Sequence, residues 1–186
     1  MRKNLGAKEA VYPMPVFIIG TFDKQGVANA MNAAWGGISE EKEISICISP
    51  EHKTTKNILH KKAFTVSMAD AKNVVSADYV GVVSGNKTTD KIQRAGWTVI
   101  ASTLIDAPIF QELPLALECR LKSYDENSCR LVGEIINVSV DQSILNEKGQ
   151  VDLTKFFPIV YDPMNHEYYA LGNKVGKAFF DGNKLI

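Results

Sequence analysis

The chain has 186 residues, of which 45% are hydrophobic and 23% are charged, and its 21 basic and 21 acidic residues cancel at neutral pH. This composition is typical of a globular protein, and the length suits a single domain, which we expect to span residues 1–186. The balanced charge gives no sign of the basic surface that nucleic-acid binding requires, so no nucleic-acid partner is expected. Pro13 and Pro15 interrupt the only apolar stretch near the N-terminus, so we expect neither a signal peptide nor a membrane span.

Strands are predicted from short apolar runs and from alternation of apolar with small or polar residues. The predicted strands are Val16–Thr21, Val27–Ala30, Ile44–Ser49, 64–67, 115–122, Cys129–Val140, Ile159–Asp162 and Tyr168–Leu171. Turns are predicted at 23–26, at 125–128 and at 163–166, between consecutive strands. Short helices are predicted over 52–62, after Asp70 as N-cap, and from Thr88 to Gly96. Seven or eight short strands with few helices favour a mainly β protein, a closed or half-open barrel, over a doubly wound fold with regular alternation.

The three cysteines, Cys47, Cys119 and Cys129, lack the CxxC spacing of a metal or redox motif. The sequence therefore predicts free, mostly buried thiols in a reducing cytoplasm. A disulfide between Cys119 and Cys129 across a hairpin is the minor alternative.

Residues 29–37 read NAMNAAWGG, which is richer in small and amide side chains than a core strand. Asn29 and Asn32 offer donors and acceptors that suit the edge of a polar heterocycle, and Trp35 offers an aromatic wall. A tight corner with a buried tryptophan explains the same residues without a ligand.

Two segments combine lysine with hydroxyl side chains, which is the chemistry of a phosphate site. The first is Lys53-Thr54-Thr55 at the start of the helix predicted over 52–62, and the second is the run 84–91. Each segment is also explained by a solvated helix cap. Neither has the GxxxxGK[ST] spacing of a P-loop.

Other reaction classes lack their signatures. The three histidines are scattered, without HExxH or Cys/His spacing, so no metal site is expected. The chain has neither GxSxG nor the Rossmann GxGxxG. Asp78 and Tyr79 are a weak candidate pair for proton transfer.

The ordered segments PVFIIGTFDKQGVANAMNAAWGG, ISICISPEHKTTKNI, FTVS, ADYVGVVSG, VGEIINV and PIVYD resemble the flavin reductase-like, FMN-binding split-barrel family, and its flavoredoxin branch most closely. The resemblance runs from about Pro13 to about Lys177. It implies a split β-barrel that forms a homodimer, binds FMN, and passes electrons from NAD(P)H through the flavin to an unknown acceptor in the cytoplasm.

The resemblance also implies the FMN-binding residues. The segment NAMNAAW matches the loop that lines the isoalloxazine. Ser49, the segment Lys53-Thr54-Thr55 and Asn57 match the ribityl and phosphate contacts. The SADYVG helix and Lys91 match a second set of flavin contacts, and Tyr161 matches an aromatic residue near the flavin. The implied cofactor-binding residues are Asn29, Met31, Asn32, Ala33, Trp35, Ser49, Lys53, Thr54, Thr55, Asn57, Lys91 and Tyr161. No dedicated catalytic acid or base is implied, because the flavin carries the redox chemistry.

Three functional hypotheses follow. The first is an NAD(P)H-dependent flavin reductase with FMN as cofactor or substrate. The alternative is a flavoredoxin-type FMN electron carrier that a protein partner reduces. A third is a barrel protein that binds another planar ligand such as haem, for which the NAMNAAW segment offers only Met31 as an axial ligand.

Overall fold

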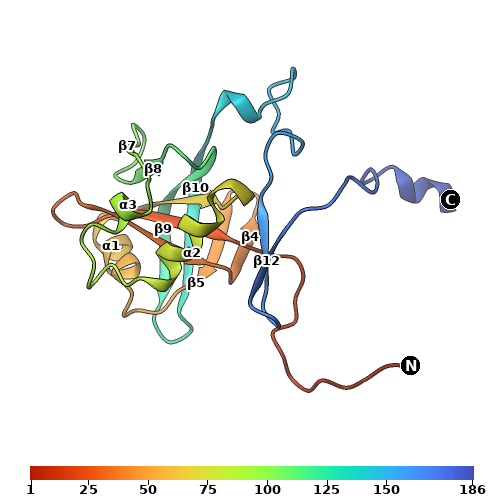
Figure 1. Ribbon diagram of the computed structural model, residues 1–186, viewed down its shortest axis with the longest axis horizontal. Helices are drawn as coiled ribbons and strands as arrows, with labels where there is room; N and C mark the ends of the chain where they lie inside the picture. The colour runs from red at the N-terminus through yellow and green to blue at the C-terminus, as the bar shows by residue number, and fades with distance from the viewer.

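The computed structural model describes all residues, 1–186, and both ends of the chain extend as arms from a body built on β-strands (Figure 1). The main sheet has seven strands, all antiparallel. Their order across the sheet is β3 (Ala28–Ala33), β2 (Phe17–Phe22), β6 (Ala63–Met68), β9 (Leu115–Asp125), β10 (Arg130–Val140), β5 (Glu43–Cys47) and β4 (Gly36–Glu40).

The remaining elements are smaller. A three-stranded sheet joins β1 (Met14–Pro15), β11 (Ile159–Asp162) and β12 (Glu167–Ala170), and a hairpin joins β7 (Val99–Ala101) to β8 (Pro108–Phe110). The helices are α1 (Lys53–Lys61), α2 (Val74–Val82) and α3 (Lys91–Arg94), with 3₁₀ turns at Ala71–Asn73, Gln142–Ile144 and Asp181–Leu185. None of the helices is long and apolar enough to span a membrane.

The two edge strands of the main sheet, β3 and β4, are consecutive in the chain. Only Ala34 and Trp35 connect them, and such a connection reaches about 10 Å at most. The sheet must therefore curl until its two edges nearly meet. The result is a barrel whose edges are joined by the chain rather than by a full ladder of hydrogen bonds.

Gly36 lies where these two edges approach each other. A Cβ atom at this position would lie 2.6 Å from the Ser45 carbonyl oxygen and 3.1 Å from the Ile46 Cα atom. Both atoms belong to the backbone of β5, which cannot move aside without opening the sheet. The barrel corner therefore requires glycine at position 36.

Apolar side chains fill the barrel and also cover its outer face. The interior contains Ile19, Ile44, Ile46, Phe64 and Leu131 among eleven buried residues. A second core of twelve buried residues lies between β2 and the segments around α2, α3 and β8, which explains why β2 is buried on both faces.

Helices α1, α2 and α3 all contact the edge strand β3. In Figure 1 they lie together on one side of the barrel. Since β3 has no second strand partner, polar groups of these helix ends and of β3 face one another across its open edge.

The prediction of a mainly β barrel with a few short helices is confirmed, and the predicted strands and turns are recovered within a few residues. Asp70 caps the turn before α2, as predicted, by accepting a hydrogen bond from the Asn73 amide. The helix predicted over 88–96 is shorter, since α3 contains only four residues.

Two interpretations of the sequence were wrong. The strand predicted over Val27–Ala30 continues to Ala33 in β3, so residues 31–33 lie in a strand rather than in the loop that the resemblance implied, and α2 packs on that strand. The thiols are free, as predicted, but Cys47 is exposed and only Cys119 is buried. Cys119 pairs with Ile135 in the β9–β10 ladder, so it does not face Cys129.

Candidate functional site

A cleft of about 370 Å³ opens along the free edge of β3. Its floor is β3, one wall is the start of α1, and the opposite wall is the end of α2 with the loop that follows. The lining residues are Asn29, Met31, Asn32, His52, Lys53, Thr54, Val80, Gly81, Val82, Val83, Ser84, Gly85 and Lys91.

Lys91, the first residue of α3, places a buried positive charge in this cleft. The residue is only 4% exposed, and no carboxylate lies within 4.0 Å of its ammonium group. Burial, together with repulsion from Lys53, lowers the pKa of Lys91 to about 8. A buried ammonium without a counter-ion is costly, so this arrangement favours an anionic ligand.

Lys53 is differently placed, because its Nζ atom lies 3.1 Å from Asp23 Oδ2. Asp23 therefore already compensates part of the charge of Lys53, whereas nothing compensates that of Lys91. Next to these lysines, the Asn29 side chain donates a 2.9 Å hydrogen bond to the Thr54 hydroxyl in a buried position. This bond fixes the floor of the cleft to the first turn of α1.

The loop after α2 approaches β3 so closely that it requires glycine. A Cβ atom on Gly85 would lie 2.1 Å from Asn29 Oδ1 and 3.3 Å from Lys53 Cδ. The backbone of this loop therefore lies directly against two of the polar residues of the cleft.

A smaller hollow of about 310 Å³ adjoins the cleft and shares Asn32, Gly81 and Val82 with it. Two tyrosines from the β11–β12 hairpin line this hollow. Tyr161 OH lies 2.7 Å from His166 Nδ1, and Tyr168 donates a 2.9 Å hydrogen bond to Asp78 Oδ1. Burial and the adjacent Asp78 carboxylate raise the pKa of Tyr168 to about 12, so it remains a hydrogen-bond donor at neutral pH.

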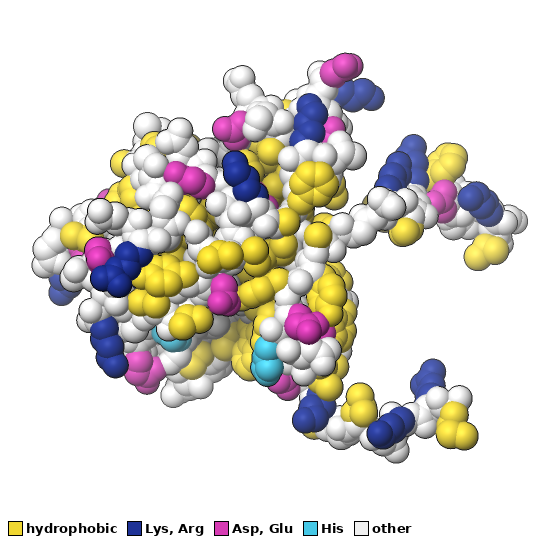
Figure 2. All heavy atoms as spheres, in the orientation of Figure 1, with side chains coloured by type: hydrophobic (Ala, Val, Ile, Leu, Met, Phe, Trp, Pro, Cys, Tyr) yellow, Lys and Arg dark blue, Asp and Glu magenta, His cyan; other side chains and the backbone are white.

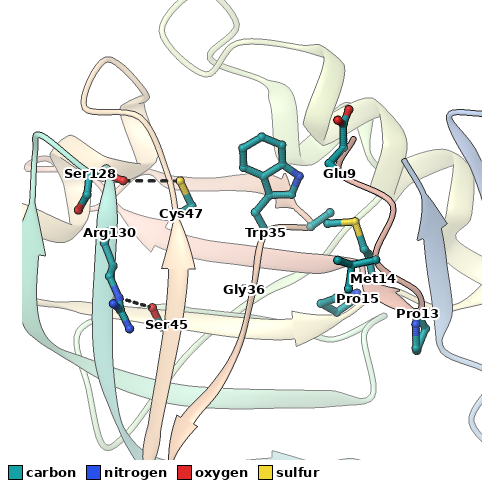
Figure 3. Close-up of a pocket in the computed structure, with 12 residues that line it drawn as sticks. Glu9, Pro13, Met14, Pro15, Trp35, Gly36, Ser45, Cys47, Ser128 and Arg130 are labelled. Carbon is teal, nitrogen blue, oxygen red and sulfur yellow. Dashed lines mark hydrogen bonds between the residues drawn. The ribbon is translucent and has the colours of Figure 1, made fainter. Parts of the chain in front are cut away.

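The third cavity is an apolar groove of about 580 Å³ beside the barrel corner. Figure 3 shows the Trp35 ring standing between Glu9 of the N-terminal arm and Cys47 of β5. Trp35 is 55% exposed. Below it, Arg130 donates a 3.1 Å hydrogen bond to the Ser45 hydroxyl. We call this cavity the Trp35 groove.

Residues 9–170 match the model of the flavin reductase like domain. The chain belongs to the flavin reductase-like family. Among solved structures it is similar to the flavoredoxin of Desulfovibrio vulgaris (Miyazaki F), at 36% identity and a TM-score of 0.94, over 98% of this chain and 100% of that one. The flavoredoxin of Methanosarcina acetivorans has 27% identity and a TM-score of 0.88, over 100% of both chains. Component B of nitrilotriacetate monooxygenase from Bacillus cereus shares the fold, at 22% identity and a TM-score of 0.79, over 95% of this chain and 100% of that one.

The sequence resembles the flavin reductase-like split-barrel family and its flavoredoxin branch, and these comparisons confirm that resemblance. The split barrel described above, with its edges joined through residues 34–35, is the fold of this family.

The cleft along the free edge of β3 brings together half of the residues that the sequence suggested for a cofactor. They are Asn29, Met31, Asn32, Lys53, Thr54 and Lys91. Ala33 and Tyr161 line the adjoining hollow instead. Trp35 lines the separate groove on the other side of the barrel corner.

The last three suggested residues line none of these cavities, and two of them hold α1 in place. The Thr55 hydroxyl donates to the Ser49 carbonyl at 2.7 Å, and the Asn57 amide donates to the Thr21 hydroxyl at 3.0 Å. Ser49 also donates a hydroxyl hydrogen bond to Glu51. Their role in ligand binding stays a prediction.

Sequence reasoning missed His166 and Tyr168, because they come from a hairpin more than 80 residues away from α2. It also paired Asp78 with Tyr79 as a proton-transfer site. Asp78 faces Tyr168 in the hollow, whereas Tyr79 packs against the outer core with its hydroxyl unpaired. Adjacent residues of a helix point in different directions, so these two cannot act together.

Proposed function

We propose that this protein is an FMN-binding oxidoreductase that passes electrons from NAD(P)H through the flavin to an acceptor. The observation that carries the proposal is the buried Lys91 ammonium, which lacks a counter-ion and shares the cleft with Lys53. A phosphate monoester supplies the missing negative charge.

The residues of the cleft fit FMN. Lys91 and Lys53 would bind the phosphate by charge-assisted hydrogen bonds, and Thr54 and Ser84 offer hydroxyl groups beside them. The amides of Asn29 and Asn32 offer donors and acceptors along the cleft, and Met31 offers an apolar contact. Bound FMN would supply hydride acceptance and electron transfer, which none of the protein's own side chains provides.

The electron donor has a place to dock without a Rossmann motif. The hollow lined by Tyr161, Tyr168 and His166 adjoins the cleft through Asn32. A nicotinamide in this hollow would lie next to the contents of the cleft. The hydroxyl of Tyr168, held by Asp78 and kept protonated, would orient it rather than exchange a proton with it.

The proposal includes a single domain over residues 1–186, a cytoplasmic location and a homodimer. Three free thiols are typical of a reducing compartment. The exposed apolar residues of the two arms and of the Trp35 groove support association between two copies of the chain.

The experiment that tests this function is an absorbance spectrum of the purified protein, followed by anaerobic addition of NADH and then of NADPH. We expect flavin bands, or their appearance after FMN is added, and bleaching by at least one nicotinamide within seconds. Flavin bands that neither nicotinamide bleaches would favour the flavoredoxin-type carrier over the reductase. A protein that takes up no FMN would refute both.

The affinity for FMN is expected to depend on pH through Lys91. Its pKa in the free protein is about 8, and a bound phosphate would raise that pKa. About half of the free protein carries the charged lysine at pH 8 and about a tenth at pH 9, so the affinity should fall about fivefold between pH 8 and 9. Fluorescence titration with FMN and with riboflavin checks this, because riboflavin lacks the phosphate and should show no such fall.

A further inference from the structure

Both arms leave the body on the same side, next to β12 (Figure 1). The N-terminal arm, residues 1–12, contains no helix or strand. The C-terminal arm, residues 171–186, contains only the 3₁₀ turn Asp181–Leu185. Its last backbone hydrogen bond to the body is made by Leu171, to the Pro158 carbonyl.

The C-terminal arm carries apolar side chains that the protein's own body does not cover. Phe179 is 104% exposed, and Val175, Leu185 and Ile186 are comparably exposed. The arm is nevertheless locally ordered, because Asp181 accepts a 2.7 Å hydrogen bond from the Lys177 amide, and the Lys177 ammonium lies 4.9 Å from the centre of the Phe180 ring. An ordered segment with so many exposed apolar groups is typical of a binding segment.

The Trp35 groove is an apolar surface that the protein's own C-terminal arm does not fill. Its lining includes residues at the base of the N-terminal arm, Val11 and Pro13, together with Trp35, Cys47 and Arg130. In the space-filling view, hydrophobic side chains gather where the arms leave the body and also along the arms themselves (Figure 2). The exposed apolar segment and the unfilled apolar groove are thus features of the same side of the molecule.

We infer that the C-terminal arm of a second copy of this chain lies in the Trp35 groove, and that the two copies exchange arms reciprocally. Each copy offers one arm and one groove, so two copies related by a twofold axis fill both grooves. Assembly therefore stops at the dimer. The inference rests on the homodimer of the proposed function and names the contact that holds it together. The superposition on the Desulfovibrio vulgaris flavoredoxin covers 98% of this chain, so most of the extended arm is a shared feature of the two structures.

A crosslinking experiment tests the contact directly. Full-length protein with Phe179→Cys in a Cys129→Ser background retains the exposed Cys47 of the groove and the buried Cys119. A short bis-maleimide should convert most of this protein to a covalent dimer on a denaturing gel. The matched variant that also carries Cys47→Ser should remain monomeric. Dimers that persist without Cys47, crosslinks within one chain, or no crosslink at all would overturn the exchange.

A second experiment uses sedimentation of the Phe179→Asp/Phe180→Asp protein. We expect the dimer to weaken at least a hundredfold, because two apolar groups at the contact become charged. Leu104→Asp, at an exposed apolar position in the loop after β7, is the control and should leave the dimer intact. A wild-type dimer that the double variant does not weaken would overturn the arm contact and keep the homodimer, whereas a monomeric wild type would overturn both.

Discussion

Replacing Lys91 with methionine is expected to lower the affinity for FMN by about 10- to 100-fold and to leave the affinity for riboflavin unchanged. The reason is that Lys91 is the buried cation of the cleft without a carboxylate partner, so its charge is available to a phosphate. A hydrogen bond to a charged group contributes about 1.5–3 kcal/mol, which corresponds to that loss. Fluorescence titration with the two flavins measures it.

The same substitution should stabilise the protein in the absence of ligand. Desolvation of Lys91 lowers its pKa from 10.5 to about 8, and removing that buried charge should raise the free energy of unfolding at pH 7 by about 1–3 kcal/mol. Lys87→Met, at an exposed position in the loop before α3, is the matched control and should change neither quantity. A Lys91→Met protein that binds FMN and riboflavin in the wild-type ratio would show that the phosphate lies elsewhere.

Replacing Gly36 with alanine is expected to lower the free energy of unfolding by about 1–3 kcal/mol, which is typical of overpacking. The added Cβ atom would lie 2.6 Å from the Ser45 carbonyl oxygen, so β4 and β5 must separate at the barrel corner. Urea denaturation followed by circular dichroism measures the change.

Gly37→Ala provides the control at the neighbouring position. A Cβ atom there would have no neighbour within 4 Å, and its main effect is to restrict the unfolded chain, which is neutral or slightly stabilising. Equal losses of stability in the two variants would contradict the close approach at Gly36. A loss confined to Gly36 would identify the corner of NAMNAAWGG as a packing requirement of the fold.

Much of the fold could be predicted from local patterns. The alternation of isoleucine with small residues in 44–49 indicates one buried face, and Ile44 and Ile46 lie inside the barrel. The turns at Asp23–Gly26 and at 125–128 also follow from local chemistry. The continuation of the strand predicted over Val27–Ala30 to Ala33 could not be predicted in this way, because the small and amide side chains there reflect a helix that packs on the strand from elsewhere in the chain.

The candidate site was only partly predictable, for a related reason. The two Lys/Thr segments were visible as separate candidates for phosphate, but no sequence pattern indicated that Lys53 and Lys91 share one cleft. Nor did any pattern indicate that only one of these two lysines has a carboxylate partner. Asp23 compensates Lys53 and leaves Lys91 without a partner, and that difference depends on a turn 30 residues before α1.

The order of residues along the chain was enough to indicate most of the strands, the residue types that offer phosphate chemistry, and the family that the chain resembles, since these depend on local patterns. Where those groups meet follows from the folded arrangement. The curl of the sheet follows from the two-residue connection between its edge strands, and it directs Trp35 to one side of the corner and Asn29 and Asn32 to the other. Tertiary packing also sets the pKa of Lys91, because burial and the nearby Lys53 together lower it to about 8.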